Sequence, residues 1–405
     1  MKKCSLLVSV IGFLLLISCT TEKKPSNPVL LISVDGLIND YLDRFDAPNI
    51  QSIIDNGVLA DGLIPVFPTK TFPNHYSLVT GLYTENTGMI SNTMYDAEMN
   101  ANYSMGNRGA VMDPRWYGGE PIWVTAELQG LTAGAMFWPG SEAPIKDTYA
   151  TYWMPYDDDM PHFARVDTLI SWLESDQKPD FMTLYFSRVD SYGHRYGPNA
   201  DEIGIALSDV DAAIGYLISE LERIGIWPDI NILITSDHGM TEVSEERVIF
   251  LDDLISLDDV DVYDWTPAAM LQPKEGKKDE VFNALKAAEN NYVVYKKEDI
   301  PDYFRVKNHH RVPEIMMIAD IGYTITSKPF FERRGVSGGA HGYDHREPDM
   351  QAFFAASGPA FKSGEKVPPF EMIHIYELMT HMLGLQPAMN DGSIDSVRHL
   401  LNPTK

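Results

Sequence analysis

The chain has 405 residues, 44% of them hydrophobic and 11% aromatic, which is enough for one large catalytic domain or two modest ones. This composition excludes a disordered or collagen-like chain. The 32 basic and 58 acidic residues give a formal net charge of −26, which argues against a nucleic-acid partner held through phosphate contacts. A small anionic substrate remains compatible with this charge, provided that a bound metal supplies local positive charge.

The N-terminal segment, residues 1–18, resembles a bacterial lipoprotein signal peptide. Two lysines precede an apolar run that is too short for a stable membrane span, and the run ends in "LISC". Cleavage there leaves Cys19 as a lipidated first residue, followed by a polar tether within residues 19–27. The alternative is an ordinary signal peptide with an incidental cysteine. We expect a lipid-anchored protein of the bacterial cell envelope, periplasmic or associated with the outer membrane.

Three apolar runs along the chain stop at acidic residues. The run "PVLLISV" ends at Asp35, "DFMTLYFSRV" ends at Asp190, and "INILITS" ends at Asp237. Continuous apolar runs predict strands that are buried on both faces. Helical patterns lie between the runs, in "APNIQSIIDNG", "HFARVDTLISWLES" and "EIGIALSDVDAAIGYLISELERIG", and the C-terminal part adds a strand in "MQAFFAAS" and a helix in "MIHIYELMTHMLG". This alternation predicts an α/β fold, a doubly wound and mostly parallel sheet flanked by helices.

Residues from about 241 to 335 break the alternation and predict a small α+β subdomain, inserted into a catalytic domain that spans residues 28–400. In open parallel sheets, ligands bind beyond the carboxyl ends of the strands, so the three strand-end acids are expected to gather at one edge. The acidic run 157–159 is expected to be a solvated loop, with a calcium site as the alternative.

Four short motifs supply candidate metal ligands. They are "SVDG" with Asp35, "DSYGH" with Asp190 and His194, "TSDHGM" with Asp237 and His238, and "GGAHGYDH" with His341. Each motif alone has an ordinary explanation, because an aspartate at a strand end often caps a helix or forms a turn. Together, three carboxylates and three imidazoles at one sheet edge favour a site for zinc or a similar divalent metal.

A fifth stretch, "GLIPVFPTKTFPNHY", places Thr69 and Thr71 before a helical pattern. A threonine in such a position is usually a helix cap. The motifs "PTKTFPNHY", "DSYGH", "SDHGM" and "GGAHGYD", together with "FWPGS" at residues 137–141, resemble the nucleotide pyrophosphatase/phosphodiesterase family of the alkaline phosphatase superfamily. The resemblance runs from about residue 28 to 395 and includes every metal motif in order.

The resemblance implies a role for each matching residue. Thr71 would be the nucleophile and Thr69 a cap or loop residue, while Asn92 would donate to a nonbridging phosphoryl oxygen. Two zinc ions per chain are implied, one held by Asp190, His194 and His341. The other would be held by Asp35, Asp237 and His238, together with the oxygen of Thr71. The implied reaction hydrolyses phosphodiester or pyrophosphate bonds of nucleotides through a phosphothreonine intermediate and releases nucleoside 5′-monophosphate.

The charges of this implied site bear on the substrate. Two zinc ions, three aspartates and an ionised Thr71 sum to zero, so an additional fixed positive charge would favour the doubly charged monoester over the diester. The nearest candidate is Lys70, whose side chain could point away. Cleavage of a diester or a pyrophosphate is therefore the predicted reaction.

Aromatic residues are candidates for holding the nucleobase. Phe72 and Tyr185 match family positions that sandwich a base, and the looser candidates are Leu37, Trp138, Tyr149 and Tyr152. Each of these could equally be a core residue. His75 is expected to be structural or to support a ligand, and His309 and His310 are expected to be surface residues.

Two other functions remain open. One is a phosphomonoesterase or a lipid-headgroup, choline-type phosphodiesterase of the same superfamily. A sulfatase is disfavoured, because no cysteine lies near the nucleophile. The other is a lipoprotein that binds metal or nucleotide without turnover, which is disfavoured because all seven ligand and nucleophile positions are filled. The expected partners are a small nucleotide or phosphodiester substrate and the membrane reached through the lipid.

Overall fold

The computed structural model describes residues 27–403, and the signal peptide and Cys19 lie outside them. Its largest element is an eight-stranded sheet in which only β18 runs antiparallel to its neighbours. The strand order is β19 (Glu365–Val367), β2 (Gly57–Ala60), β18 (Phe354–Ser357), β9 (Asn231–Thr235), β1 (Val29–Val34), β8 (Phe181–Phe186), β6 (Ala133–Met136) and β7 (Tyr152–Trp153). The predicted mostly parallel α/β sheet is confirmed.

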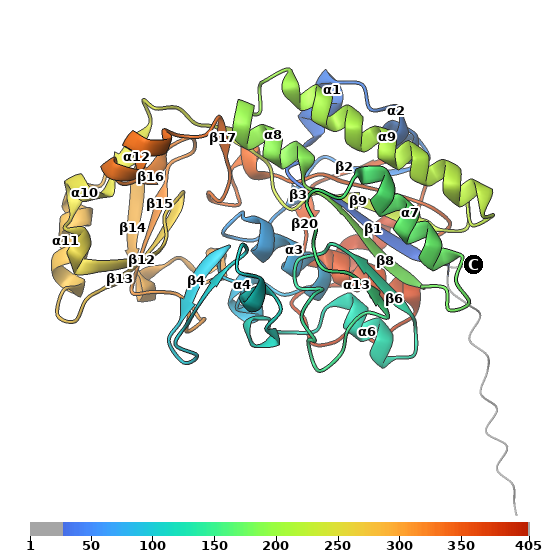
Figure 1. Ribbon diagram of the computed structural model, residues 1–405, viewed down its shortest axis with the longest axis horizontal. Helices are drawn as coiled ribbons and strands as arrows, with labels where there is room; N and C mark the ends of the chain where they lie inside the picture. Colours follow the sequence, from blue (N-terminus) through green and yellow to red (C-terminus); the bar gives the residue numbers. More distant parts are fainter. Residues whose placement is uncertain (1–26, 404–405) are drawn as a thin grey trace, which may run out of the picture.

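Helices cover both faces of this sheet (Figure 1), because its central strands are apolar on both sides. In β1, the side chains of Val29 and Leu31 join one core cluster, and those of Leu30 and Ile32 join the other. The first cluster includes residues of α3 (Thr71–Thr80), α6 (Ile122–Leu128) and α13 (His374–Leu383). The second includes residues of α1 (Asn39–Arg44), α2 (Pro48–Asp55), α7 (His162–Leu173), α8 (Arg188–Tyr196) and α9 (Glu202–Arg223).

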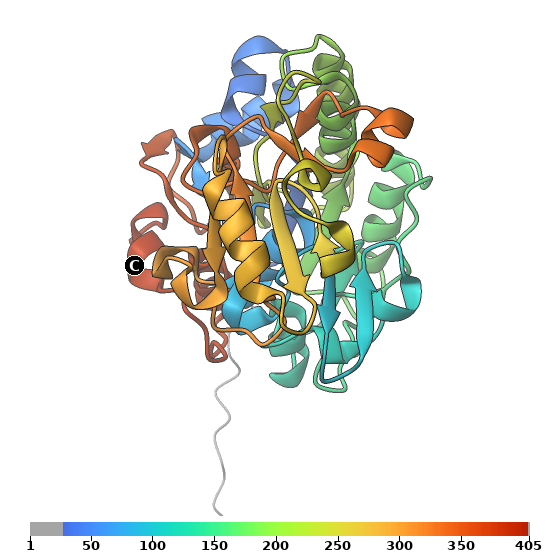
Figure 2. The same cartoon turned by 90° about the vertical axis from the view of Figure 1, so that its left-hand side faces the viewer.

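A second sheet of four antiparallel strands lies to one side of the main sheet, at the left of Figure 1 and facing the viewer in Figure 2. Its strand order is β12 (Val260–Asp264), β13 (Ala268–Pro273), β15 (Ile315–Ala319) and β14 (Tyr292–Lys296). One face of this sheet has its own apolar cluster, in which Val281 and Leu285 of α11 (Lys278–Ala287) pack against the strands, and the other face, with Met270 and Met316, joins the first cluster of the main sheet. These elements lie within residues 241–335.

Short elements complete the described chain. The remaining helices are α4 (Thr84–Thr87), α5 (Arg108–Val111), α10 (Leu251–Leu254), α12 (Lys328–Arg334) and α14 (Ile394–Val397). The remaining strands pair as β3 (Leu63–Ile64) with β20 (Phe370–Glu371), β4 (Thr93–Asp96) with β5 (Ala101–Ser104), β10 (Thr241–Glu242) with β17 (Gly339–Ala340), and β11 (Val248–Phe250) with β16 (Thr324–Thr326). Within residues 27–403, every helix is too short or too polar to cross a membrane.

Candidate active site

The register of the three central strands brings the acidic motifs to one edge. Strand β1 lies between β8 and β9, with Val34 paired to Phe186 and Ser33 paired to Thr235. The residues that follow these strands therefore emerge side by side, and the backbone N–H of Asp190 donates to the carbonyl of Asp35 at 3.0 Å. The predicted meeting of the strand ends follows from this register.

Gly36 permits the close approach of these strand ends. Its φ of +70° is a backbone angle that residues with a side chain rarely adopt. A Cβ at this position would lie 3.1 Å from the Cα of Asp190. Its backbone N–H also donates to Oδ1 of Asp237 at 3.3 Å. A glycine at this position thus lets acidic residues from three different strands share one small space.

All six predicted ligands fall into two clusters, divided as the family resemblance implied. One consists of Asp190, His194 and His341; the other consists of Asp35, Asp237 and His238. Within each cluster the ligand atoms lie within 4.8 Å of one another. The clusters adjoin, because the rings of His238 and His341 stack with their centroids 3.5 Å apart.

The donor atoms of these clusters fit divalent cations. Oδ1 of Asp35 and Oδ1 of Asp190 are buried and have no hydrogen-bond partner, while Oδ2 of Asp237 and Nε2 of His238 lie 2.9 Å from each other. Buried polar atoms are normally satisfied, so two unpartnered carboxylate oxygens, one in each cluster, point to negative charge that a cation would satisfy. Mixed carboxylate and imidazole ligands are the set that zinc accepts.

Each histidine is oriented for ligation by a hydrogen bond on its other ring nitrogen. The Nδ1 of His194 lies 2.9 Å from the carbonyl of Gly339, and that of His341 lies 2.7 Å from the carbonyl of Thr69. The Nδ1 of His238 lies 2.9 Å from the carbonyl oxygen of Gly239. Donation from Nδ1 to a carbonyl leaves the Nε2 lone pair free for a metal, which is the usual arrangement around protein metal ions.

The electrostatics also show a deficit of positive charge. Burial raises the pKa of Asp35, and the neighbouring carboxylates of Asp237 and Asp190 raise it further. Burial alone would likewise raise the pKa of Asp237, but His238 and His75 hold that pKa well below its usual value. Three carboxylates are thus crowded into one buried space, which a divalent cation would neutralise.

Thr71 is the first residue of α3, and it lines the same cavity as Asp35 and Asp190, one ligand from each cluster. Asn92 lies beside it, because its Oδ1 accepts the backbone N–H of Phe72 at 2.9 Å. With its oxygen used in this way, the Nδ2 of Asn92 remains as a donor. Thr69 has a different role, since its hydroxyl accepts the N–H of Gly342 at 2.8 Å and so holds the loop that carries His341.

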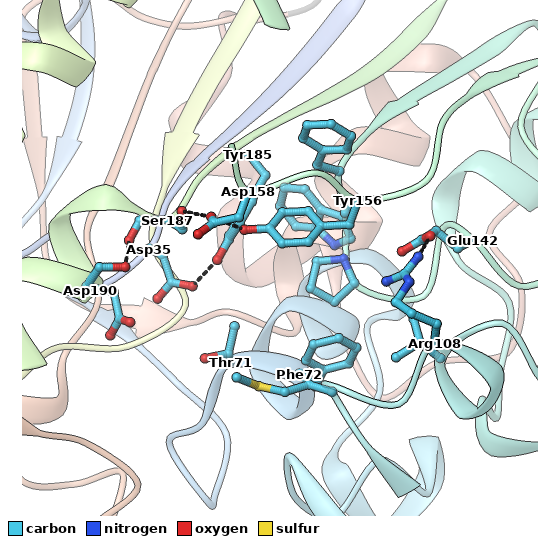
Figure 3. A pocket seen from close by; sticks show the side chains of 16 residues that line it. Asp35, Thr71, Phe72, Arg108, Glu142, Tyr156, Asp158, Tyr185, Ser187 and Asp190 are labelled. Carbon is cyan, nitrogen blue, oxygen red and sulfur yellow. Dashed lines mark hydrogen bonds and ion pairs between the residues drawn. The ribbon is translucent and has the colours of Figure 1, made fainter. Parts of the chain in front are cut away.

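The cavity next to Thr71 has a volume of about 290 Å³. Phe72 and Tyr156 lie on opposite sides of it in Figure 3, and the ion pair between Arg108 and Glu142 lies at the end away from Asp190. An apolar space lined by aromatic rings accepts a planar ring system. The arrangement can therefore hold an aromatic base at one end and a phosphate group at the other.

The remaining predicted pocket residues are placed differently. Tyr185 lines the cavity, and its hydroxyl donates to Oδ2 of Asp35 at 2.6 Å. It therefore forms part of the cavity wall and also holds the carboxylate of a candidate metal ligand. Leu37 is fully buried and Tyr152 stacks on Trp172, and neither lines the cavity. Of the looser candidates, Trp138 and not Tyr149 lines it.

Tyr156 was missed by the sequence analysis. It stands in "MPYDDD", beside the acidic run that was expected to be a solvated loop. The run is exposed, but Asp158 also reaches the cavity and accepts the hydroxyl of Tyr156 at 2.6 Å and that of Ser187 at 2.9 Å. The sequence offered one signal for Tyr156, an aromatic residue next to clustered acids. Its distance in space from the other motifs, however, is set only by the fold.

A mostly parallel sheet that carries these two ligand clusters at its carboxyl edge defines an alkaline phosphatase-like hydrolase of phosphate esters. A family model described as type I phosphodiesterase / nucleotide pyrophosphatase matches residues 29–344. The chain therefore belongs to the nucleotide pyrophosphatase/phosphodiesterase family, whose members hydrolyse phosphodiester and pyrophosphate bonds.

Curated relatives and solved structures agree with this assignment. The human bis(5′-adenosyl)-triphosphatase ENPP4 is 40% identical over 92% of this chain and 82% of its own length. Human ectonucleotide pyrophosphatase/phosphodiesterase family member 5 is 38% identical over 98% of this chain and 83% of its own length. A solved structure of murine ectonucleotide pyrophosphatase/phosphodiesterase 5, an inactive threonine-to-alanine variant in complex with AMP, matches 93% of this chain and 100% of its own with a TM-score of 0.89 and 37% identity.

Proposed function

We propose that this chain is a zinc-dependent nucleotide pyrophosphatase/phosphodiesterase that releases nucleoside 5′-monophosphate through a phosphothreonine intermediate. One observation carries the proposal: a single cavity is lined by Thr71, by a ligand of each cluster, and by the rings of Phe72 and Tyr156. A nucleotide has the matching parts, a planar base joined through a sugar to a phosphate.

Each side chain has a defined task in this scheme. Phe72 and Tyr156 bind the base, while Nδ2 of Asn92 donates to a phosphoryl oxygen and so orients the phosphorus. Thr71 at the start of α3 lies where backbone N–H groups point toward negative charge. When bound, two zinc ions supply the positive charge that favours ionisation of a nearby hydroxyl and neutralises phosphate oxygens.

The bond changes are those of a double displacement. The Oγ1 of Thr71, its proton given up to solvent, attacks the phosphorus next to the nucleoside, and the bond to the leaving oxygen breaks with its electron pair, so that the leaving oxygen takes up a proton from solvent. Water then attacks the same phosphorus and breaks its bond to Oγ1, which releases nucleoside 5′-monophosphate and restores the threonine hydroxyl. AMP in the murine relative and the triphosphatase name of the human relative support a nucleotide substrate.

The test compares a nitrophenyl ester of a nucleoside 5′-monophosphate with plain nitrophenyl phosphate, using zinc-loaded protein. We expect the diester to be preferred by several orders of magnitude, and Thr71→Ala to abolish its turnover. Thr71→Ser, which keeps a hydroxyl, is the matched control and should retain activity. A preference for the monoester would identify a phosphatase, and turnover that survives Thr71→Ala would eliminate the phosphothreonine.

Lipid anchoring in the bacterial cell envelope is a second part of the proposal, and it rests on the N-terminal sequence alone. The support is the "LISC" motif before Cys19. In a bacterial expression host, Cys19→Ala should move the protein from the membrane fraction to the soluble fraction without changing its catalytic constants. Equal membrane association of both forms would contradict the lipid anchor.

A further inference from the structure

The lysine next to the nucleophile is paired with a carboxylate of the inserted sheet. Lys70 directly precedes Thr71, and its Nζ contacts Oδ2 of Asp264 at the end of β12. Lys70 is 6% exposed and Asp264 is 9% exposed, so water screens this pair little. The two residues are 194 positions apart in the sequence, so the ion pair exists only in the folded chain.

Other contacts fix the Asp264 carboxylate in this position. Its Oδ2 also accepts the hydroxyl of Ser91, and its Oδ1 accepts the backbone N–H of Trp265 at 2.9 Å. Ser91 directly precedes Asn92, the proposed donor to the phosphoryl group. Asp264 is thus connected to the two segments that carry Thr71 and Asn92, through Lys70 in one and Ser91 in the other.

The lysine side chain passes close to the metal-ligand loop as well. A Cβ added at Gly342, directly after the ligand His341, would lie 3.0 Å from Cε of Lys70. The lysine side chain therefore passes beside the loop that carries His341, and its charge is matched by Asp264. In the proposed site the two zinc ions, three aspartates and ionised Thr71 already sum to zero, so one additional free cation would act on the substrate charge.

We propose that Asp264 is a specificity-determining residue, which pairs with Lys70 and so withholds its positive charge from the phosphoryl group. This keeps the site selective for phosphodiesters, with one negative charge at the reacting phosphate, over monoesters with nearly two. The inference rests on the proposed function. It assigns to the four-stranded sheet a part in substrate choice, although Asp264 does not itself line the cavity.

The first experiment measures kcat/KM for the nucleotide diester and for nitrophenyl phosphate in a double-mutant cycle. Asp264→Asn keeps the shape and removes the charge, and it should raise the monoester-to-diester ratio about tenfold, which corresponds to ~1.4 kcal/mol. Lys70→Gln should leave the ratio within about twofold of wild type, because the lysine charge is already withheld. The double variant should behave like Lys70→Gln, since no lysine remains to be released.

The matched control is Asp261→Asn on the same strand. Asp261 forms an exposed ion pair with Lys274 at 2.5 Å, and its loss should leave the ratio unchanged. Equal losses for both esters in Asp264→Asn would make Asp264 purely structural and overturn the proposal. A roughly tenfold fall of the ratio in Lys70→Gln would also overturn it, because the lysine charge would then already act on the phosphate.

A binding measurement separates this proposal from the proposed function. In the Thr71→Ala background, calorimetry compares AMP, which is doubly charged, with its singly charged phosphate methyl ester. Adding Asp264→Asn should raise the preference for AMP about tenfold, and an unchanged preference would overturn the role of Asp264. If wild-type protein hydrolysed no nucleotide ester, the proposed function would fail while this binding comparison still decided the role of Asp264.

Discussion

The hydroxyl of Tyr185 donates to Oδ2 of Asp35 across 2.6 Å in the buried centre of the site. Burial raises the pKa of Tyr185 well above its usual value, and the negative charge of Asp35 adds to this effect, so the phenol stays protonated and remains a donor. The hydrogen bond occupies one oxygen of the carboxylate and leaves Oδ1, which has no hydrogen-bond partner, directed at the cluster. Tyr185 therefore orients the carboxylate of a candidate metal ligand.

Tyr185→Phe should lower the affinity for zinc about 10- to 100-fold, the usual effect of losing a partner of a ligand. Competition with a coloured chelator measures this affinity directly. Tyr156→Phe is the control, because it removes a hydroxyl from the same cavity. That hydroxyl donates to Asp158, which belongs to neither ligand cluster. Equal zinc affinities for wild type and Tyr185→Phe would show that the hydrogen bond does not support the site.

Phe72→Ala and Tyr156→Ala should each raise the KM of a nucleotide ester by the equivalent of about 1–3 kcal/mol, because each removes one stacking surface for the base. Methyl nitrophenyl phosphate, in which a methyl group replaces the nucleoside and the nitrophenyl group leaves, tests the phosphate end separately, and its hydrolysis should change much less. Tyr149→Ala, which removes an exposed ring stacked on Trp153 outside the cavity, is the control. Equal losses for both substrates would argue against a base-binding role for these rings.

Zinc removal should abolish turnover and lower the melting temperature, because the three clustered aspartates lose their compensating charge. A ligand at 1,000 times its Kd stabilises a fold by about 4.1 kcal/mol. Elemental analysis should find two zinc ions per chain in wild type and one in either His194→Ala or His238→Ala. One ion per chain in fully active wild-type protein would contradict the two-zinc proposal.

His309 should make the free energy of unfolding depend on pH in the mildly acidic range. Burial, together with the positive charge of Arg311, lowers its pKa to about 4. Its Nδ1 accepts the backbone N–H of Arg311 at 3.2 Å, which requires the unprotonated form of that nitrogen. In the unfolded chain its pKa is about 6.5, so the unfolded state binds more protons between pH 6.5 and 4. Stability should therefore fall as the pH falls through this window.

The size of this effect is about 1–2 kcal/mol once partial solvent access is allowed for. His309→Asn keeps an acceptor for Arg311 without a titrating group, so urea unfolding at several pH values should show a flatter profile. His381→Asn, at an exposed histidine of α13, controls for the loss of one histidine. Parallel profiles for His309→Asn and wild type would remove His309 as the cause.

The clustering of the candidate ligands was predictable from sequence, because each acid follows a buried apolar strand at close spacing and the order of parallel strands brings such ends together. Asp35, Asp190 and Asp237 needed only the register of three strands. His309 and His310 were expected to be surface residues, and His310 is exposed, whereas His309 is half-buried. The His309 ring packs against the backbone at Gly88, where an added Cβ would lie only 2.7 Å from its Nε2. The sequence around His309 does not predict that contact.

The pocket was less predictable, because its walls depend on loops. Tyr156 reaches the cavity from a segment without regular structure, whereas Tyr152, four residues earlier, belongs to edge strand β7 and stacks on Trp172. The direction of Lys70 was also undetermined, since its partner Asp264 is supplied by a distant strand. Long-range pairs of this kind are set by tertiary packing and leave no periodic pattern in the sequence.

The inserted segment leaves and rejoins the main domain at hydrogen-bonded neighbours. Thr241 pairs with Ala340 and Glu242 pairs with Gly339, only a few residues from His238 on one side and directly before His341 on the other. The ends of the long segment are thus tied together beside the candidate ligands, so the distance between His238 and His341 is set by a few ladder hydrogen bonds and not by the length of the chain that separates them.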